Sequence, residues 1–379
     1  MAGRLRTDYE PIAAELAERD ADAFVHVGDR FDDDLRYLTR FSGPDRAYAF
    51  VYREDEAFLP APALFAEQAE RDFPGTVLPA GDGPRKTASE RAADLLEPDS
   101  TVLVPAHVPH ETAVRLERAG HDLASTTVVD GMRAVKSDAE IDRLRAVQTA
   151  TVEGMRRAET VLAEAVVEGD GVRWAGETLT TERLRREVNA TFAAEGLTDA
   201  GNTVIGAGPS CADLHFTGND TIVPGETVLL DLSPRGPDGY YGDCSRTFVV
   251  ESEGGWERRA HVAVERAQDA AFDALSSGAG TPANEVHREA AAEIGAYGFS
   301  PTGEPGFTHG IGHGVGVSLH EAPSMRSSEP LEPGMVLTVE PGVYDGTIGG
   351  VRIEDLVLVT EDGYELLGEY HRSLVPRLE

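Results

Sequence analysis

The sequence predicts two domains, a smaller α/β domain followed by a larger α+β domain. Its 379 residues exceed the usual size of a single domain. Residues 1–130 alternate short strand-like and helix-like segments, which is typical of an α/β layer structure. Residues 131–379 carry long amphipathic helices with apolar strands between them, which is typical of helices packed on an antiparallel sheet. We therefore expect the domain boundary near residue 130.

In the first domain we expect four helices, at residues 9–19, 62–71, 90–96 and 109–119. The strands expected between them are at residues 23–27, 48–52, 76–78 and 101–104. His26 lies inside the first of these strands. A hydrogen-bonded histidine of the core or surface is a simpler interpretation of it than a metal ligand. We recognise no cluster of catalytic residue types in this domain.

The second domain opens with a helix whose start is marked by a capping box. Ser137 accepts at the helix start and Glu140 reaches back to it, and we expect the helix to continue to about residue 168. Further helices are expected at residues 181–192, 256–275 and 282–296. Strands are expected at residues 227–232, 240–250, 335–340 and 350–359, with the loop 234–239 making the first two a hairpin.

Acidic residues dominate the charge of the whole chain. The sequence has 67 Asp and Glu residues against 34 Lys and Arg, a net charge of −33, and Lys86 and Lys136 are its only lysines. Such a surface repels nucleic acid and anionic lipid, so we expect neither as a partner. It suits a cytosol of molar salt, where the Debye length falls to about 3 Å. We predict a halophilic source; an acidic protein of an ordinary mesophile is the alternative.

The chain carries no signal for a membrane or for secretion. It has no run of about 18 apolar residues, and its N-terminal residues lack the apolar core of a signal peptide. The expected compartment is therefore the cytoplasm. Cys211 and Cys244 are too few for a cysteine-only zinc site, and we expect each to be a small buried apolar residue rather than half of a disulfide.

A glycine-rich segment, residues 307–323, carries three histidines, His309, His313 and His320. Glycines leave its backbone free to adopt unusual conformations and to approach other groups closely. Three imidazoles on such a segment indicate a metal site or a proton-transfer site. The alternative is a glycine-rich loop in which the histidines are incidental.

Four acidic residues interrupt or end the apolar strands of the second domain, namely Asp231, Asp243, Glu340 and Glu354. In the strand 350–359, Glu354 shares one face with Arg352 by the period of two. A buried carboxylate must be paired or ligated, so we expect these acids to form a five-ligand cluster with His313. Two divalent cations would neutralise it. An oxygen-rich set with one imidazole favours manganese, ahead of cobalt, iron or zinc.

These residues in this order resemble the pita-bread metallopeptidase family, peptidase family M24, which includes prolidase, aminopeptidase P and methionine aminopeptidase. The resemblance covers residues 131–379, and implies a pita-bread catalytic domain. The family's metal ligands fall on Asp231, Asp243, His313, Glu340 and Glu354. The interval between Asp231 and Asp243 is one residue longer than the family pattern, which a loop can absorb.

The first domain resembles the N-terminal domain of the creatinase and prolidase branch. Residues 34–41, Asp-Leu-Arg-Tyr-Leu-Thr-Arg-Phe, are similar to that branch's Asn-Leu-x-Tyr-Leu-Thr-Gly-Phe. Methionine aminopeptidases lack this domain, so the resemblance favours the prolidase and Xaa-Pro aminopeptidase branch. Asp34 and Arg40 depart from that pattern, which leaves the contacts of this domain with substrate open.

The resemblance also implies roles around the cluster. His215 and His320 would hold substrate and stabilise the tetrahedral intermediate, and Glu340 would carry a proton. His309, Arg352 and Tyr344 would bind substrate or orient the ligands. The implied reaction is hydrolysis of Xaa-Pro peptide bonds by a metal-bridging hydroxide, in a homodimer, with aminopeptidase or dipeptidase action left open.

Three alternatives remain at the level of sequence. One is another C–N hydrolase or lyase on the same scaffold, such as an amidohydrolase of compatible solutes. A second is metal-free catalysis of the creatinase kind, although that branch loses the acidic ligands kept here. The third is a non-catalytic peptide-binding module, and such modules also tend to lose ligands.

Overall fold

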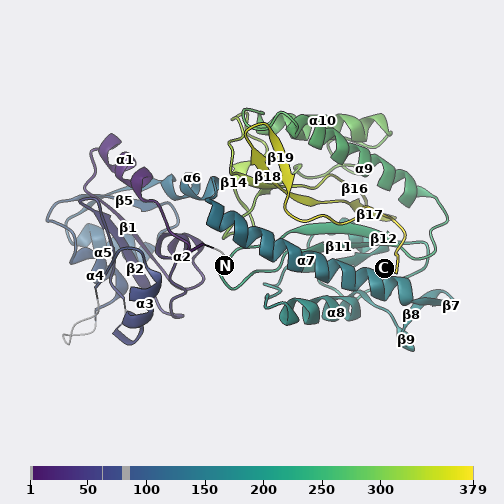
Figure 1. The fold of residues 1–379 in the computed structure, drawn as a ribbon, viewed down its shortest axis with the longest axis horizontal. Coiled ribbons are helices and arrows are strands. Elements are labelled where there is room, and N and C mark those ends of the chain that lie inside the picture. The colour runs from purple at the N-terminus through teal and green to yellow at the C-terminus, as the bar shows by residue number, and fades with distance from the viewer. Residues whose placement is uncertain (1–2, 62, 79–85, 379) are drawn as a thin grey trace. The chain divides into compact units, whose positions relative to one another are not determined.

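The structure is a computed structural model, and it describes residues 3–61, 63–78 and 86–378. The chain divides into two compact units, Gly3–Arg133 and Ala134–Glu379. Figure 1 shows the helices and strands of both units in chain order. No helix among the described residues is long and apolar enough to cross a membrane.

The first unit is built on a six-stranded sheet with the strand order β4-β3-β2-β1-β5-β6. Its strands are β1 (Ala23–Gly28), β2 (Tyr48–Arg53), β3 (Glu56–Leu59), β4 (Thr76–Val77), β5 (Thr101–Pro105) and β6 (Asp122–Thr126). Its helices are α1 (Glu10–Glu18), α2 (Asp33–Thr39), α3 (Ala66–Asp72), α4 (Ala88–Ala93), α5 (His110–Arg118) and α6 (Val128–Ala134). Strand β1 pairs antiparallel with β2 and parallel with β5, so the sheet is mixed.

Sequence alone missed several elements of this unit. The short helices α2 and α6 and the strands β3 and β6 were not expected, because none of them has a long apolar repeat. The helix expected at residues 62–71 is a 3₁₀ turn at Ala63–Phe65 followed by α3. Residue 62 lies outside the described residues.

In the second unit, two pairs of helices flank the sheets (Figure 1). The pairs are α7 (Asp138–Glu164) with α8 (Thr181–Ala194), and α9 (Trp256–Leu275) with α10 (Ala283–Ala296). Apolar side chains of α7 and α8 form one core with strands β10 (Thr203–Ala207), β11 (Thr227–Leu232) and β12 (Cys244–Val249). Those of α9 and α10 form another with the later strands. Two layered halves therefore meet across the sheets.

The strands of the second unit form four sheets. Strands β10, β11 and β12 form an antiparallel sheet in that order, and a five-stranded sheet has the order β14-β13-β15-β18-β19. The strands of the five-stranded sheet are β13 (His313–Gly314), β14 (Glu321–Ser324), β15 (Val336–Val339), β18 (Asp355–Thr360) and β19 (Gly363–Leu366). Strands β16 (Gly342–Asp345) and β17 (Gly349–Arg352) form a separate pair, and in the chain they lie between β15 and β18. Three short strands, β7 (Val166–Glu168), β8 (Gly171–Trp174) and β9 (Glu177–Thr178), form a separate meander.

The prediction of a single strand at residues 350–359 is wrong. The chain leaves β17 after Arg352 and enters β18 at Asp355, so Ile353 and Glu354 form a junction between two sheets. Strand β17 pairs with β16, whereas β18 pairs with β15. An apolar run with period two does not reveal that its strand changes partner. The face that Arg352 and Glu354 were expected to share is therefore not the face of one strand.

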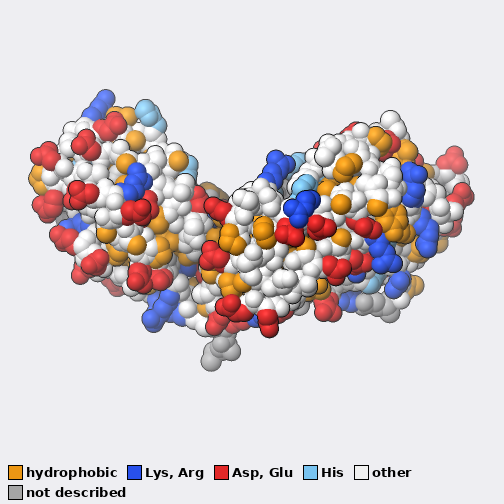
Figure 2. Space-filling model, turned by 90° about the horizontal axis from the view of Figure 1, so that it is seen from above, with side chains coloured by type: hydrophobic (Ala, Val, Ile, Leu, Met, Phe, Trp, Pro, Cys, Tyr) orange, Lys and Arg blue, Asp and Glu red, His pale blue; other side chains and the backbone are white. Residues whose placement is uncertain are grey.

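Other elements also begin or end at residues that differ from the predicted ones. Helix α7 ends at Glu164, and the residues expected to extend it turn into β7. The strand expected from Tyr240 begins only at Cys244, because residues 234–243 form a loop held by a bridge between Arg235 and Tyr241. Glu140 does reach back to the backbone N–H of Ser137, at 2.9 Å, as the capping box predicts. Acidic side chains are spread over the face shown in Figure 2.

Candidate metal centre

The antiparallel pair β11–β12 brings the first two predicted ligands to one end of a sheet. Asp231 lies opposite Ser245 in the register, and Asp243 immediately precedes β12. Asp243 is 3% exposed, and its Oδ1 accepts a hydrogen bond of 2.9 Å from Ser233. Its backbone exchanges two hydrogen bonds with the amide side chain of Gln148, which fixes it to α7. The hairpin therefore holds both carboxylates on a rigid support.

His313 is held so that one ring nitrogen faces the carboxylates. Its Nδ1 lies 3.1 Å from the carbonyl of Gly314, and its backbone N–H donates to Thr338 at 3.1 Å. The other nitrogen, Nε2, lies 3.5 Å from Glu340 Oε1 and 3.7 Å from Asp243 Oδ2. Gly312 is required here, because a Cβ at this position would lie 2.0 Å from the carbonyl oxygen of Thr338. The glycines thus allow the histidine segment to lie against β15.

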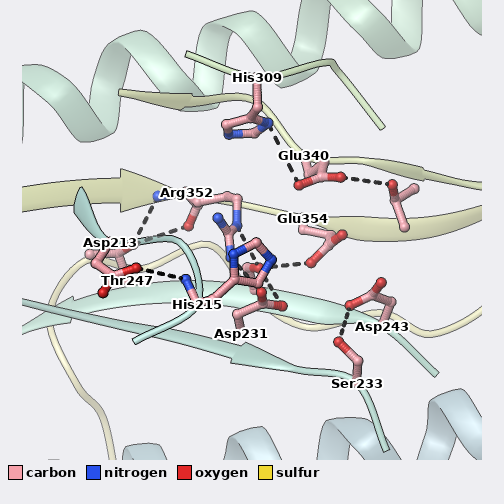
Figure 3. Close-up of polar contacts among 12 residues, drawn as sticks. Asp213, His215, Asp231, Ser233, Asp243, Thr247, His309, Glu340, Arg352 and Glu354 are labelled. Carbon is pink, nitrogen blue, oxygen red and sulfur yellow. Dashed lines mark hydrogen bonds and ion pairs between the residues drawn. The ribbon is translucent and has the colours of Figure 1, made fainter. Parts of the chain in front are cut away.

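Glu340 follows β15 and has one oxygen held and one oxygen free of strong partners. Thr338 donates to Oε1 at 3.2 Å. Oε2 lies 3.9 Å from His309 Nδ1, which is beyond hydrogen-bond distance. Figure 3 shows Glu340 and Glu354 pointing toward the same space as Asp231 and Asp243.

Glu354, at the junction between β17 and β18, is 2% exposed. Ser245 donates its hydroxyl to Glu354 Oε2 at 2.7 Å, and Oδ1 of Asp231 lies 3.3 Å from the same hydroxyl. One ligand atom from each of Asp243, His313 and Glu354 lies within 4.8 Å of the others. The change of sheet between β17 and β18 therefore brings Glu354 to the predicted cluster. The sequence predicted that Glu354 belongs to the cluster, but it did not predict this change of sheet.

A chain of polar contacts runs along one side of the cluster. Arg352 forms an ion pair with Asp231 at 2.6 Å and donates to the hydroxyl of Tyr344 at 3.0 Å. The same hydroxyl lies 2.8 Å from His309 Nε2. Arg352 and Tyr344 are both buried. Arg352 thus lies where it orients Asp231, and His309 contacts the cluster only at its edge.

The acids raise one another's pKa values. Burial and the neighbouring carboxylates raise the pKa of Glu354 to about 8, and burial raises that of Glu340 to about 7 against the opposing effect of Arg352. Burial, then Glu354, raises the pKa of Asp243 as well. Arg352 forms an ion pair with Asp231, so at full ionisation the other three carboxylates of the cluster have no arginine or lysine partner among the described residues.

This donor set fits divalent metal ions. Two ions carry four positive charges, which offsets the excess of negative charge that four carboxylates and one arginine leave. The ring nitrogen of His313 that faces the acids accepts no hydrogen bond among the described residues, as a ligating imidazole requires. Oxygen ligands with one nitrogen suit hard and borderline metals. The residues present therefore match the group that the sequence predicted.

His320 and His215 lie at the open side of the cluster. The ring of His320 is centred 4.0 Å from that of His313, and both His215 and His320 are exposed. Desolvation, then His313, lowers the pKa of His320 to about 4, so its imidazole is neutral near pH 7. Burial, then Arg352, lowers that of His309 to about 3. Neutral imidazoles can accept or donate one proton to a bound substrate.

A pocket of about 380 Å³ adjoins the cluster on the side of His309. Its lining includes His287, Phe307 and the exposed cation Arg326. A cation at this pocket can form an ion pair with a carboxylate of a bound ligand.

Several supporting residues were missed by sequence reasoning. Ser245 lies two positions after Asp243, near the start of β12, and the strand period of two could have identified it. Arg246, inside the same apolar strand, was the other visible signal. It is 1% exposed, and it donates to the backbone of Glu354 and Tyr370 and pairs with Asp355 at 2.6 Å. Gln268 of α9 donates to the other oxygen of Asp355 at 2.9 Å.

The sequence of this chain is similar to known peptidases. Metallopeptidase family M24 matches residues 142–361. A probable dipeptidase PepE of Mycobacterium tuberculosis is 30% identical over 243 residues, which is 63% of this chain and 60% of that protein. The Xaa-Pro dipeptidase of Pyrococcus furiosus is 37% identical over 177 residues, 46% of this chain and 49% of that protein. Each of these matches thus spans less than two thirds of the relative's own length.

The fold is similar to solved structures over nearly its whole length. The prolidase from Pyrococcus furiosus superposes with a TM-score of 0.81 at 25% identity, covering 95% of this chain and 99% of that one. This likeness confirms the predicted fold, a pita-bread α+β domain preceded by a smaller α/β domain. It also accounts for the two layered halves around the cluster.

Proposed function

Because the chain belongs to metallopeptidase family M24, we propose that it is a metal-dependent exopeptidase that hydrolyses Xaa-Pro peptide bonds. The observation that carries this proposal is the cluster of four carboxylates and one imidazole, in which Asp243 and Glu354 are buried and the other three residues are partly buried. Asp243, His313 and Glu354 each bring one ligand atom within 4.8 Å of the others. The first unit, in this proposal, is the N-terminal domain of the creatinase and prolidase type, with its boundary near residue 130.

The residues proposed to hold two divalent ions are Asp231, Asp243, His313, Glu340 and Glu354. Manganese fits this oxygen-rich set, with cobalt, iron or zinc as the other candidates. When bound, such ions act as Lewis acids that polarise a carbonyl oxygen and make water a nucleophile near neutral pH. Arg352 holds Asp231 in place, and Ser245 and Ser233 hold Glu354 and Asp243.

Glu340 is proposed as the proton carrier of the reaction. Only its Oε1 accepts a hydrogen bond from Thr338, which leaves Oε2 able to take a proton and release it to the leaving amine. His320 and His215, on the open side, are proposed to hold the substrate and stabilise the oxyanion by donating hydrogen bonds. Tyr344 keeps His309 fixed at the edge of the site.

The pocket beside His309 supports action on short substrates. Arg326 at this pocket offers a positive charge to a free carboxylate. In an Xaa-Pro dipeptide that carboxylate is two bonds from the scissile nitrogen, whereas in a longer peptide it is replaced by an amide. We therefore favour dipeptidase over aminopeptidase action.

A high-salt cytoplasm and a homodimer complete the proposal. The net charge of −33 supports the first, because salt screens repulsion between the acidic side chains. It also makes nucleic acid an unsuitable partner. The homodimer rests on the family resemblance, and light scattering at several salt concentrations tests it.

The decisive experiment is a hydrolysis panel with added Mn²⁺ and high salt. Xaa-Pro dipeptides, longer Xaa-Pro peptides and the matched Xaa-Ala peptides are compared for wild type and for Asp243→Ala. We expect cleavage of Xaa-Pro dipeptides by wild type alone. Metal binding without cleavage of any peptide would replace the proposal with another C–N hydrolase or a peptide-binding module.

A further inference from the structure

We propose that the first unit holds a binding site of its own for a divalent transition-metal ion, formed by His26, Asp34 and His107. One ligand atom from each residue lies within 4.8 Å of the other two. These residues come from β1, from α2 and from the turn after β5. All three belong to the first unit, whereas the acidic cluster belongs to the second.

The spacing of these side chains suits one ion. His107 Nε2 lies 3.4 Å from Asp34 Oδ2. Two ligand atoms at about 2.1 Å from a tetrahedral ion are about 3.4 Å apart. The rings of His26 and His107 are 5.2 Å apart between centroids and nearly perpendicular. The exposed side chain of His107 can adjust, since only the other two are fixed by burial.

His26 carries the second, independent observation. Its side chain is completely buried, and its Nε2 lies 2.8 Å from Asp32 Oδ1. Its other ring nitrogen, Nδ1, is buried and has no hydrogen-bond partner among the described residues. The sequence led us to expect a hydrogen-bonded histidine of the core or surface, and only one of its two ring nitrogens has a hydrogen-bond partner. A carboxylate on one nitrogen of an imidazole, with the other nitrogen unpartnered, is the arrangement of a ligating histidine.

Asp34 is also divided between two tasks. Its Oδ1 pairs with the buried Arg133, while its Oδ2 faces His107. Asp32 caps the start of α2 through the backbone N–H of Leu35 at 2.8 Å, so it stays fixed next to His26. With Asp32 and Asp34 ionised and Arg133 charged, the site carries one net negative charge. A divalent cation is therefore attracted to it.

The ligand set defines the class of ion. Two imidazoles and one carboxylate bind zinc, cobalt, nickel, copper or ferrous iron, and offer too few oxygens for magnesium or calcium. The exposure of His107 leaves room for water to complete the coordination. Such an ion would tie three separate segments of the first unit together. We assign it a stabilising role in that unit rather than a part in hydrolysis.

The experiment counts zinc ions per chain in the full-length protein. The double variant Asp243→Ala/Glu354→Ala removes two ligands of the acidic cluster, and we expect it to retain one Zn²⁺ per chain after equilibrium dialysis. Adding His107→Ala should remove that ion. The control is His110→Ala, another exposed histidine three residues away at the start of α5, which should keep it.

Wild type provides a second reading that does not depend on the double variant folding. His107→Ala should bind one zinc ion fewer per chain than wild type and than His110→Ala, and its thermal unfolding should respond less to added Zn²⁺. Equal zinc content in the His107 and His110 variants would overturn the proposal. So would a double variant that is folded by circular dichroism and binds no zinc. Neither outcome bears on peptide hydrolysis, which the hydrolysis panel tests.

Discussion

Removing the metal ions should reverse the usual benefit of neutral pH for this protein. The folded, metal-free protein has the pKa of Glu354 at about 8 and that of Glu340 at about 7, against 4.5 for an ordinary glutamate. Between these values the folded state binds more protons than the unfolded state. The free energy of unfolding must therefore fall as the pH rises from about 5 to about 8.

The expected size of the loss is on the order of 5 kcal/mol. Each pKa unit corresponds to about 1.4 kcal/mol, so a glutamate shifted from 4.5 to about 8 accounts for roughly 5 kcal/mol. Glu340 alone would account for roughly 3 kcal/mol. The two contributions do not add, because part of the rise in the pKa of Glu354 comes from the charge of Glu340, and one of the two acids can stay protonated. A loss of this size approaches the whole stability of many proteins.

The assay is urea unfolding at pH 5.5 and pH 8.5, with EDTA and with saturating Mn²⁺. With EDTA we expect the midpoint to fall steeply at the higher pH, and with Mn²⁺ the stabilisation by metal should grow with pH, because protons no longer compete for the ligands. Glu354→Gln should reduce the pH dependence in EDTA. Glu361→Gln, at an exposed position, is the matched control. A metal-free protein equally stable at both pH values would refute the reasoning.

Three further variants test single contacts. Asp243→Ala should lower the rate of Xaa-Pro hydrolysis by more than the roughly 100-fold that supporting residues contribute, with unchanged circular dichroism. Full turnover by this variant after its metal has been stripped would exclude the mechanism. Ser245→Ala, which loses the hydroxyl donated to Glu354, should weaken metal binding roughly 10- to 100-fold in calorimetric titrations, whereas Ser252→Ala should not. Arg326→Ala should raise KM for Xaa-Pro dipeptides about tenfold or more but not for Xaa-Pro amides, and equal effects on both would remove its role with the carboxylate.

Local sequence patterns predicted much of the fold. The elements that were missed depend on which segments pair with one another in three dimensions. Helix α9 begins and ends where its apolar repeat predicts, and the β11–β12 hairpin follows from two apolar runs around a Gly/Pro loop. Strands β17 and β18 could not be separated, because the change of partner at Glu354 leaves no mark in an apolar run. Residues 166–178 read as a helix end and a loop, but they pair with one another as a meander.

The sequence likewise predicted some residues of the candidate site and missed others. Charged residues inside apolar strands identified Asp231, Asp243, Glu340 and Glu354, since burial of a charge demands a partner. Ser245 and Gln148 were not predicted, because serine and glutamine are unremarkable in a sequence and matter only through the atoms they touch. His26 was expected to be a hydrogen-bonded histidine of the core or surface; it is buried, and its unpartnered nitrogen could be seen only in three dimensions.

The buried guanidinium of Arg246 connects the segment around Tyr370 and His371 to the candidate metal centre. It joins the carbonyls of that segment to the backbone of Glu354, and Glu159 anchors the same segment through Tyr370 and His371. If docking of this segment strengthens metal binding at the candidate centre, metal binding must strengthen docking by the same free energy. In that case, a molecule that displaced the segment would weaken metal binding without contacting any of the proposed ligands.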